Sequence, residues 1–283
     1  MDTMEPKADL HIHSCYSDSD LSIQEILKRA SEKGLKAIAV TDHDTVEGVD
    51  EALQVSDQYQ VECISGIEIS AQYRDFEVHI LGYLLDHHSV PLRDALSDIK
   101  NVRIQRLIDM AEKMNKLGFK VDTDELLKDI QGRIVTRFHL ALYLVAHGIV
   151  SNIKEAFLKY LAPGKPAYAA RLKFSAQEAI RLILDAGGVP VLAHPHMLAD
   201  QRWIEEFIEY GIRGIEAVYP GFSKSQRQRY RKFAKEHDLC MTGGSDAHGN
   251  LKKYNDIGSV TVPYSYVEQM KDEQRRIILK RNV

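Results

Sequence analysis

The stretch Asp9-Leu10-His11-Ile12-His13-Ser14-Cys15-Tyr16-Ser17-Asp18 lies close to the N-terminus and predicts both a strand and a site. In an extended strand successive side chains point to opposite faces, so His11 and His13 share one face while the apolar residues beside them share the other. Two imidazoles at a strand end are a pair of metal ligands, and Asp18, just past the strand, adds an oxygen ligand. A single His-x-His pair is more often explained as polar residues at a strand end than as a metal site. The metal interpretation is favoured because the same design recurs downstream.

Short apolar runs alternate with helical patterns on both sides of the middle of the chain. Strands are expected at residues 36–40, 61–68, 76–83, 189–193, 214–218 and 239–243, and helices at residues 23–33, 47–59, 176–186, 203–210 and 224–237. Ser22 and Glu25 form a capping-box pattern at the first helix, and Gly34 follows its end. Strands that alternate with helices indicate a parallel sheet or barrel, here with seven strands once the opening strand is included.

The middle of the chain has a different pattern. Apolar positions at helical spacing predict helices at residues 92–117, 124–130, 137–147 and 152–161. Pro163-Gly164-Lys165-Pro166 is a rigid turn that is expected to return the chain to the barrel. We therefore predict an α/β barrel formed by residues 1–90 and 170–283, interrupted by a helical insertion of residues 91–169.

Composition excludes several classes of protein. With 283 residues, 44% of them hydrophobic, the chain can bury the core of one large domain with an insertion. A net charge of -4 argues against a protein that coats long nucleic acid or an anionic membrane. Cys15, Cys63 and Cys240 are odd in number and widely spaced, and neither a secretory leader pattern nor a long apolar run is present. These features favour the reducing cytoplasm.

Metal-competent side chains close nearly every predicted strand. In a parallel α/β barrel the C-terminal ends of the strands meet at one mouth, where the active site lies. The candidate ligands are His11, His13, Asp18, His43, Glu68, His79, His194, Asp246 and His248. Nine nitrogen and oxygen ligands exceed what one metal uses, and they suit a cluster of two or three divalent ions.

The remaining histidines have a plainer interpretation. They lie on predicted loops or helices and are expected to be ordinary surface residues: His87, His88, His147 and His237. The role of His196 stays open, because it follows a predicted strand but His194 lies nearer to the strand end.

Together these motifs resemble those of a known family. His11-x-His13 with Asp18, Thr41-Asp42-His43-Asp44, Ser65-Gly66-Ile67-Glu68, His79, Ala193-His194-Pro195 and Ser245-Asp246-Ala247-His248 resemble the successive motifs of the PHP (polymerase and histidinol phosphatase) metallophosphoesterases. The resemblance runs from about residue 8 to residue 250 and implies a distorted seven-stranded (β/α)7, TIM-like barrel with a trinuclear site. The loop after Asp18 departs from the common Asp-Gly-Thr-Leu-Ser-Pro pattern, which affects the shape of the loop but not the ligand.

The resemblance also implies which side chains hold which ion. The first metal takes His11, His13, Glu68 and Asp246; the second shares Glu68 and adds His79 and His194; the third takes Asp18, His43 and His248. Three divalent ions bring six positive charges and the carboxylates Asp18, Glu68 and Asp246 return three, so the pocket attracts anions. Metal ions that share a bridging water lower its pKa and yield a hydroxide nucleophile near neutral pH. Here Glu68 and Asp246 are expected to hold that water.

The insertion indicates a substrate class. It and Lys165 resemble the branch whose members hydrolyse nucleoside 3′,5′-bisphosphates or trim short RNA from its 5′ end. Arg137, His139 and Lys165 are the candidates for binding substrate phosphate, because Arg offers a bidentate fork and Lys a point charge. We expect a small phosphorylated substrate, a nucleotide or short oligonucleotide, and neither long nucleic acid nor a membrane as partner.

Three alternatives stay open at this point. Histidinol-phosphate phosphatase belongs to the same family, and the metal ligands do not choose the leaving group. An amidohydrolase-type barrel also begins with His-x-His, but no Lys closes a predicted strand, whereas Glu68 occupies a bridging position. A non-catalytic metal-binding PHP module is the third alternative, which the complete ligand set disfavours. The metal itself stays open among Mn, Fe and Zn, because mixed His and carboxylate ligands accept all three.

Overall fold

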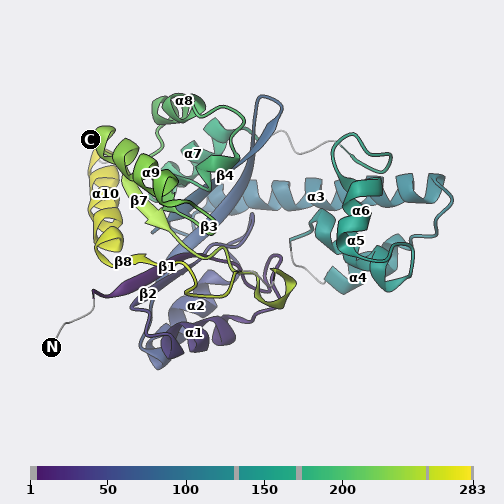
Figure 1. Cartoon of the computed structure of the whole chain (residues 1–283), viewed down its shortest axis with the longest axis horizontal. Helices are drawn as coiled ribbons and strands as arrows, with labels where there is room; N and C mark the ends of the chain where they lie inside the picture. Colours follow the sequence, from purple (N-terminus) through teal and green to yellow (C-terminus); the bar gives the residue numbers. More distant parts are fainter. Residues whose placement is uncertain (1–4, 131–133, 170–173, 253–254, 282–283) are drawn as a thin grey trace. The chain divides into compact units, whose positions relative to one another are not determined.

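The His-x-His stretch forms strand β1 (Lys7–Ile12), and every residue of this strand from Ala8 onward is buried. The computed structural model describes residues 5–130, 134–169, 174–252 and 255–281 (Figure 1). The chain divides into two compact units: unit 1 contains Met1–Asp94 and Phe174–Val283, and unit 2 contains Ala95–Lys173. The predicted return to the barrel at residue 170 lies outside the described residues.

Within the described residues, unit 1 is built on one sheet of eight strands in the order β7-β6-β5-β4-β3-β2-β1-β8. The other strands are β2 (Ala37–Val40), β3 (Glu62–Tyr73), β4 (Phe76–Tyr83), β5 (Val189–Leu192), β6 (Gly214–Val218), β7 (Cys240–Gly243) and β8 (Val262–Pro263). At the end of β1, Ile12 forms a parallel bridge with Ala247, which follows β7. The sheet therefore nearly closes, as the predicted α/β barrel requires.

The structure corrects the predicted barrel in two respects. An eighth strand, β8, pairs antiparallel with the start of β1; a two-residue strand has no periodicity for a sequence to show. In addition, β4 runs antiparallel to both β3 and β5. Tyr73 pairs with Phe76, so only two residues join β3 to β4. A connection of this length makes a hairpin, since a parallel crossover needs a dozen or more residues.

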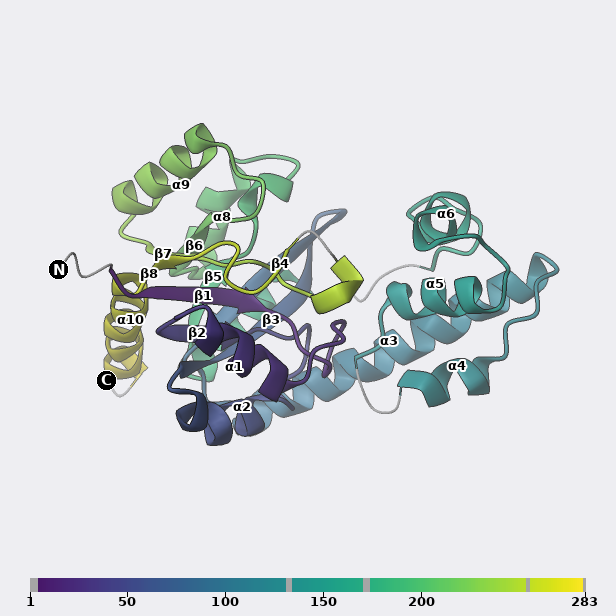
Figure 2. The same ribbon diagram turned by 60° about the horizontal axis from the view of Figure 1, so that its bottom comes forward.

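Helices cover the sheet of unit 1, as Figures 1 and 2 show. They are α1 (Ile23–Glu32), α2 (Val49–Val55), α7 (Ala176–Asp185), α8 (Trp203–Tyr210), α9 (Lys224–Glu236) and α10 (Ser265–Arg281), with short turns η1 (Ser56–Tyr59), η3 (Pro195–Met197) and η4 (Gly249–Lys252). The predicted capping box of α1 is present, since Ser22 accepts from the backbone of Glu25 and Glu25 accepts from the backbone of Ser22. Helix α10 was not predicted, because its buried residues are sparse in a strongly charged segment.

The apolar residues of β1 belong to two separate clusters. Leu10 packs with Tyr83 and Val191, whereas Ile12 packs with Ile26 of α1. The pairing of β1 with β2 shifts register between Asp9 and Ile12. Leu10 and Ile12 are fully buried, and burial of each large apolar side chain contributes about 1.5–3 kcal/mol to the free energy of unfolding. The strand that carries His11 is thus held on both sides.

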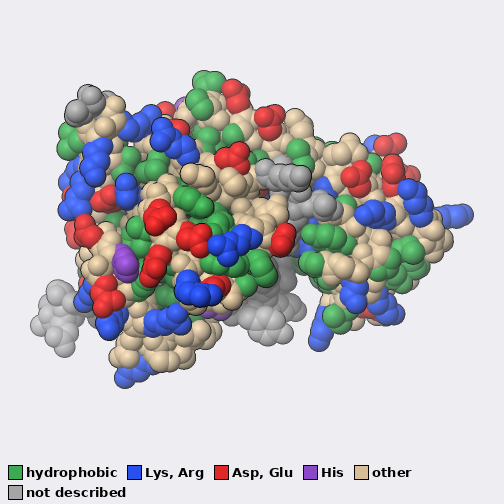
Figure 3. All heavy atoms as spheres, turned by 90° about the horizontal axis from the view of Figure 1, so that it is seen from above, with side chains coloured by type: hydrophobic (Ala, Val, Ile, Leu, Met, Phe, Trp, Pro, Cys, Tyr) green, Lys and Arg blue, Asp and Glu red, His purple; other side chains and the backbone are tan. Residues whose placement is uncertain are grey.

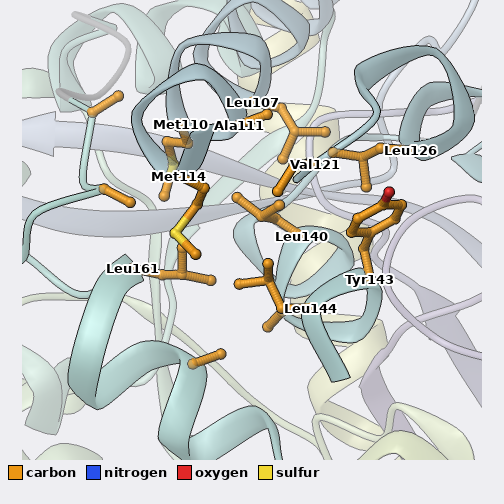
Figure 4. Close-up of a cluster of buried hydrophobic side chains, with 14 of the residues drawn as sticks. Leu107, Met110, Ala111, Met114, Val121, Leu126, Leu140, Tyr143, Leu144 and Leu161 are labelled. Atoms are coloured by element: carbon orange, nitrogen blue, oxygen red, sulfur yellow. The ribbon is translucent and has the colours of Figure 1, made fainter. Parts of the chain in front are cut away.

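Unit 2 has its own hydrophobic core. Its helices are α3 (Val90–Lys116), which begins in unit 1, α4 (Thr123–Ile130), α5 (Arg137–Ala146) and α6 (Ile153–Ala156), followed by a π-helical turn, η2 (Phe157–Leu161). Met110 and Met114 of α3 pack with Leu140 and Leu144 of α5, and all four are fully buried (Figure 4). The predicted helices of the insertion are therefore confirmed.

The surface carries charges of both signs. Figure 3 shows acidic and basic side chains interspersed over one face of the molecule. Among the described helices, none combines the length and the apolar character needed to cross a membrane.

Candidate metal centre

The structure gathers the nine predicted ligands of unit 1 into one site. Eight of them form three overlapping groups whose potential ligand atoms lie within 4.8 Å of one another: His13, Asp18, His43 and His248; His11, His13 and Asp246; and His43, Glu68 and His79. The ninth, His194, lies with its Nε2 atom 3.0 Å from Glu68 Oε1. Segments from both ends of unit 1 thus meet at one point.

Glu68 lies at the centre of this site and is almost completely buried. Its Oε2 atom is 3.3 Å from the nearest ring nitrogen of each of three histidines: His11, His13 and His43. Its Oε1 atom is 2.8 Å from His79 Nδ1 and 3.0 Å from His194 Nε2. One carboxylate therefore faces five imidazoles, which is the arrangement expected of a ligand that bridges ions.

Asp18 and Asp246 are the other two carboxylates of the site. Asp18 Oδ1 lies 3.2 Å from His248 Nε2 and 3.6 Å from His13 Nδ1. Asp246 Oδ1 lies 3.1 Å from His13 Nε2 and 3.5 Å from His11 Nε2. His13 thus lies between the two carboxylates.

The ligands do not all stand at the C-terminal ends of strands, contrary to the prediction. Glu68 lies in the middle of β3, because the strand continues for five more residues to Tyr73. His79 lies in the first half of β4 and pairs with Ser70 of β3. Since β4 runs antiparallel to its neighbours, its first half lies beside the C-terminal ends of the parallel strands. His79 therefore reaches the site from the N-terminal half of its strand, whereas the other ligands lie in the C-terminal half of their strands or follow them.

The backbone at the site is locally strained. His194 and Asp246 have φ angles of 26° and 49°, a left-handed region that residues other than glycine rarely adopt. Such positions cluster at functional sites, where the surrounding structure enforces them. Gly244 lies against β1 so closely that a Cβ atom there would be 2.3 Å from His11 N. This close approach brings Asp246 beside His11.

The electrostatics of the site follow from its burial. Burial lowers the pKa of His13, but the neighbouring Asp246 and Glu68 outweigh it and raise that pKa to about 9. Burial likewise opposes charge on His79, and Glu68 and Glu77 raise its pKa to about 10. For His43 burial dominates and lowers the pKa to about 3. Burial alone would raise the pKa of Glu68, but the surrounding histidines hold it well below its ordinary value.

Unsatisfied nitrogen atoms test whether the site fits divalent ions. Both ring nitrogens of His13 and Nδ1 of His43 are buried without a well-aligned hydrogen bond to any described residue. Buried polar atoms normally have a partner, and a cation bound to one ring nitrogen of each histidine would supply it. Imidazole nitrogens and carboxylate oxygens are ligands of Zn, Fe and Mn. The side chains present therefore fit a divalent metal cluster.

Sequence reasoning missed Glu216, a buried carboxylate on β6. Its Oε1 atom lies 3.0 Å from His11 Nδ1, and its Oε2 atom accepts a hydrogen bond of 2.7 Å from the backbone N–H of His194. A carboxylate that accepts from the distal nitrogen of a metal-binding His fixes its tautomer and orientation. The only sequence signal for this role is one Glu inside the apolar strand Gly214–Val218.

Further buried residues hold the loops that carry ligands. Asp9 accepts hydrogen bonds from the backbone N–H groups of Ser245 and Gly258, at 2.9 and 2.8 Å, and so ties β1 to the segment that bears Asp246. Asp42 accepts from the backbone N–H of Ser14 at 2.7 Å, which fixes the loop after His13. Tyr219 donates its hydroxyl hydrogen to Asp246 Oδ2 at 2.7 Å.

The predicted phosphate-binding residues lie in unit 2. Arg137 is the first residue of α5, with its guanidinium 5.7 Å from the ring centre of Phe157. His139 Nδ1 accepts a hydrogen bond of 3.1 Å from the backbone N–H of Thr136, the N-cap of α5. Lys165 is exposed in the turn that precedes the return to unit 1. Their contact with substrate stays a prediction.

The other histidines lie apart from the candidate metal site around Glu68, although His87 and His88 form with Asp50 a separate group whose potential ligand atoms lie within 4.8 Å of one another. His87 and His88 contact Asp50, with Nε2–Oδ1 distances of 2.8 and 3.1 Å. His147 stacks on Tyr143, and His237 stacks on Phe233. His196 contacts the ring of Tyr219 at a centroid distance of 5.2 Å. His196 therefore touches a neighbour of the ligand Asp246 rather than joining the metal-binding groups.

Comparison with known proteins agrees with this geometry. The family model described as PHP domain matches residues 9–186, and the model described as PHP-associated matches residues 224–262. A 5′-3′ exoribonuclease of Haemophilus influenzae is 36% identical over 87% of this chain and 91% of its own length. A 3′,5′-nucleoside bisphosphate phosphatase of Chromobacterium violaceum is 30% identical over 88% of this chain and 90% of its own.

A solved structure shares the same fold. A proposed metal-dependent phosphoesterase of Bifidobacterium adolescentis is 29% identical, with a TM-score of 0.85 over 93% of this chain and 94% of that one. Both the sequence matches and the structural match extend over most of the molecule. The chain belongs to the PHP domain family and is a metal-dependent hydrolase of phosphate esters.

Proposed function

We propose that the nine residues gathered around Glu68 hold two or three divalent ions. His11, His13, Glu68 and Asp246 are assigned to the first ion, Glu68, His79 and His194 to the second, and Asp18, His43 and His248 to the third. The observation that carries this proposal is the position of Glu68, whose two oxygen atoms face five histidines at 2.8–3.3 Å. Mn, Fe and Zn all suit these ligands.

The bound ions supply a water of lowered pKa and an electrostatic clamp for the phosphoryl oxygens. The residues of the chain have the complementary tasks. Glu68 and Asp246 hold the reacting water in place, and their charge balances only part of that of the ions, so the site attracts phosphate. Glu216 and Tyr219 orient the ligands His11 and Asp246 and do not themselves touch the substrate. No side chain is required as a covalent nucleophile.

The substrate we propose is a small phosphomonoester of nucleotide type. A nucleoside 3′,5′-bisphosphate and the 5′ end of a short RNA are the leading candidates. The Chromobacterium violaceum relative is named a 3′,5′-nucleoside bisphosphate phosphatase and the Haemophilus influenzae relative a 5′-3′ exoribonuclease. Arg137, His139 and Lys165 are assigned to a second phosphate of this substrate. Histidinol phosphate is a poorer candidate, because its other end is cationic and these side chains are basic.

Two other classes of protein are disfavoured. An amidohydrolase-type site commonly uses a bridging modified Lys, whereas the central bridging position here is occupied by Glu68. A purely structural metal module is disfavoured by the family match across most of the chain to proteins named for phosphatase and exoribonuclease activity. We further propose that the protein works in the cytoplasm, which the odd number of widely spaced cysteines supports.

A substrate screen tests the proposed function. The full chain, reconstituted with Mn, is assayed for phosphate release from nucleoside bisphosphates, sugar phosphates and histidinol phosphate. With short 5′-phosphorylated RNA, the release of both phosphate and mononucleotides is measured. We expect the highest kcat/KM for a nucleotide substrate, with Asp246→Asn as the inactive control. Turnover of histidinol phosphate above that of every nucleotide would overturn the substrate assignment.

A further inference from the structure

Helix α9 presents a row of basic side chains on one flank. Lys224, Arg227, Arg231 and Lys235 follow one another at spacings of three and four residues, and this spacing places them on the same side of a helix. The side of α9 that packs against the rest of unit 1 is marked by Tyr230 and Ala234, which are buried, and Arg227 borders this side because it is partly buried. The four cations therefore form a continuous stripe beside the packed face. We call these four residues the α9 stripe.

The cations of the α9 stripe have no carboxylate partners among the described residues. Among the described residues, no carboxylate oxygen lies within 4.0 Å of a side-chain nitrogen of the stripe, and the ion pair found on α9 joins Lys232 to Glu236. Several cations on other helices of unit 1 do have such partners, as Arg181 has in Asp185 at 3.0 Å and Lys271 in Glu62 at 2.6 Å. Three stripe residues are exposed, and the partly buried Arg227 has an Nε atom with no hydrogen-bond partner among the described residues. A row of uncompensated cations attracts a polyanion.

The stripe begins at the same end of the sheet as the metal centre. Strand β6 ends at Val218, and the next residue, Tyr219, donates its hydroxyl hydrogen to the ligand Asp246 at 2.7 Å. Helix α9 starts five residues later and packs on β6 and β7, as Figure 2 shows. A helix that follows a parallel strand runs back along the sheet, so Lys224 lies at the metal end and Lys235 lies at the far end.

The length of the stripe matches an extended ligand rather than a single phosphate. The 13 residues of α9 rise 1.5 Å each, which gives a helix of about 20 Å. A nucleoside bisphosphate at the metals does not extend that far. A single-stranded oligonucleotide carries one charge per phosphodiester, and positively charged surfaces follow such backbones. The overall charge of -4 and the presence of only four stripe cations favour a short strand over long nucleic acid.

We propose that the α9 stripe binds the phosphodiester backbone of a short single-stranded oligoribonucleotide whose 5′ end occupies the metal centre. This inference rests on the proposed function, and it names the part of the substrate beyond the reacting nucleotide. Lys224 and Arg227 contact the phosphodiesters that follow the second phosphate, and Arg231 and Lys235 contact those farther along. The stripe thereby favours oligonucleotides of several residues over mononucleotides.

Charge reversal at the far end of the stripe tests the proposal. The full-length variant Arg231→Glu/Lys235→Glu is compared with the control Lys28→Glu/Lys280→Glu, which reverses two exposed lysines on α1 and α10. We measure how much kcat/KM falls in the stripe variant on two substrates, a 5′-phosphorylated oligoribonucleotide of about eight residues and a nucleoside bisphosphate. We expect the fall on the oligoribonucleotide to be about tenfold larger, or more, than the fall on the bisphosphate. The salt dependence of log KM for the oligonucleotide becomes shallower by about 1.4, since each contact with a single strand contributes roughly 0.7.

A binding measurement separates this proposal from the proposed function. Fluorescence anisotropy with a labelled oligoribonucleotide, in EDTA and without turnover, is expected to show weaker binding for the stripe variant and unchanged binding for the control. If the wild-type chain binds the oligonucleotide through the stripe but hydrolyses no nucleotide, the proposed function is wrong and the proposal for the α9 stripe is supported. Equal binding by wild type and stripe variant, equal losses in both variants, or binding of phosphatidylserine vesicles in place of the oligonucleotide would each overturn the stripe proposal.

Discussion

His11 Nδ1 lies 3.0 Å from Glu216 Oε1, and both side chains are fully buried. A carboxylate only accepts hydrogen bonds, so this contact places the proton of His11 on Nδ1 and leaves Nε2 to face Glu68 and Asp246. In Glu216→Gln the side-chain amide nitrogen can occupy the position of Oε1. Two hydrogen-bond donors, this amide and the Nδ1–H group of His11, would then face each other. We expect the affinity for Mn to fall by about 10- to 100-fold while the metal-free protein keeps its fold.

Metal titration by isothermal calorimetry and thermal unfolding of the metal-free chain measure these two effects. Glu205→Gln, an exposed change of the same kind on α8, is the matched control. Wild-type affinity in Glu216→Gln would show that the carboxylate is not needed to orient His11. Loss of the metal-free fold would show that Glu216 serves stability instead.

Glu68→Gln is expected to abolish nearly all turnover while unfolding stays cooperative. The substitution keeps the size of the side chain but removes the charge that faces five histidines. Steady-state phosphate release measures the loss. Activity above about a tenth of wild type, which corresponds to less than roughly 1.4 kcal/mol of lost barrier lowering, would contradict the bridging role.

Arg137→Ala and Lys165→Ala test the proposed second phosphate site. Each removes a cation that we assign to the phosphate not being cleaved, so KM for a nucleoside 3′,5′-bisphosphate is expected to rise far more than KM for p-nitrophenyl phosphate. Lys154→Ala, an exposed lysine of unit 2, serves as the control. If KM rises equally for both substrates, these residues contact only the reacting phosphate.

Leu144→Ala probes the core of unit 2. Leu144 is fully buried in that core (Figure 4), so truncation removes apolar contacts and leaves a cavity. We expect the free energy of unfolding to fall by about 2–5 kcal/mol. Urea denaturation checks this against Leu158→Ala, whose side chain is 59% exposed and whose loss should be small.

The elements with a strong apolar pattern were predictable from sequence. Strands β1, β2 and β5 and the capped helix α1 lie where their patterns place them, and polar residues at the predicted strand ends indicated the candidate metal ligands. The direction of β4 was not predictable from that pattern, because both directions have the same alternation. Only the two-residue connection between Tyr73 and Phe76 signals it.

The residues that orient the ligands were harder to predict. Glu216 is a single acidic residue in an apolar strand, and its partners His11 and His194 are 205 and 22 positions away in the sequence. Asp9 likewise has a partner, Ser245, that is 236 positions away. Such contacts arise only when the barrel nearly closes, and no local pattern encodes them. The roles of Arg137, His139 and Lys165 stay predictions from residue type.

The metal content of the purified chain tests the central claim most directly. After reconstitution with Mn and removal of unbound ions, elemental analysis by mass spectrometry gives the number of ions per chain. The nine converging ligands predict two to three ions per chain, with phosphatase activity that rises as these sites fill. Less than one ion per chain in the folded, reconstituted protein would contradict the cluster.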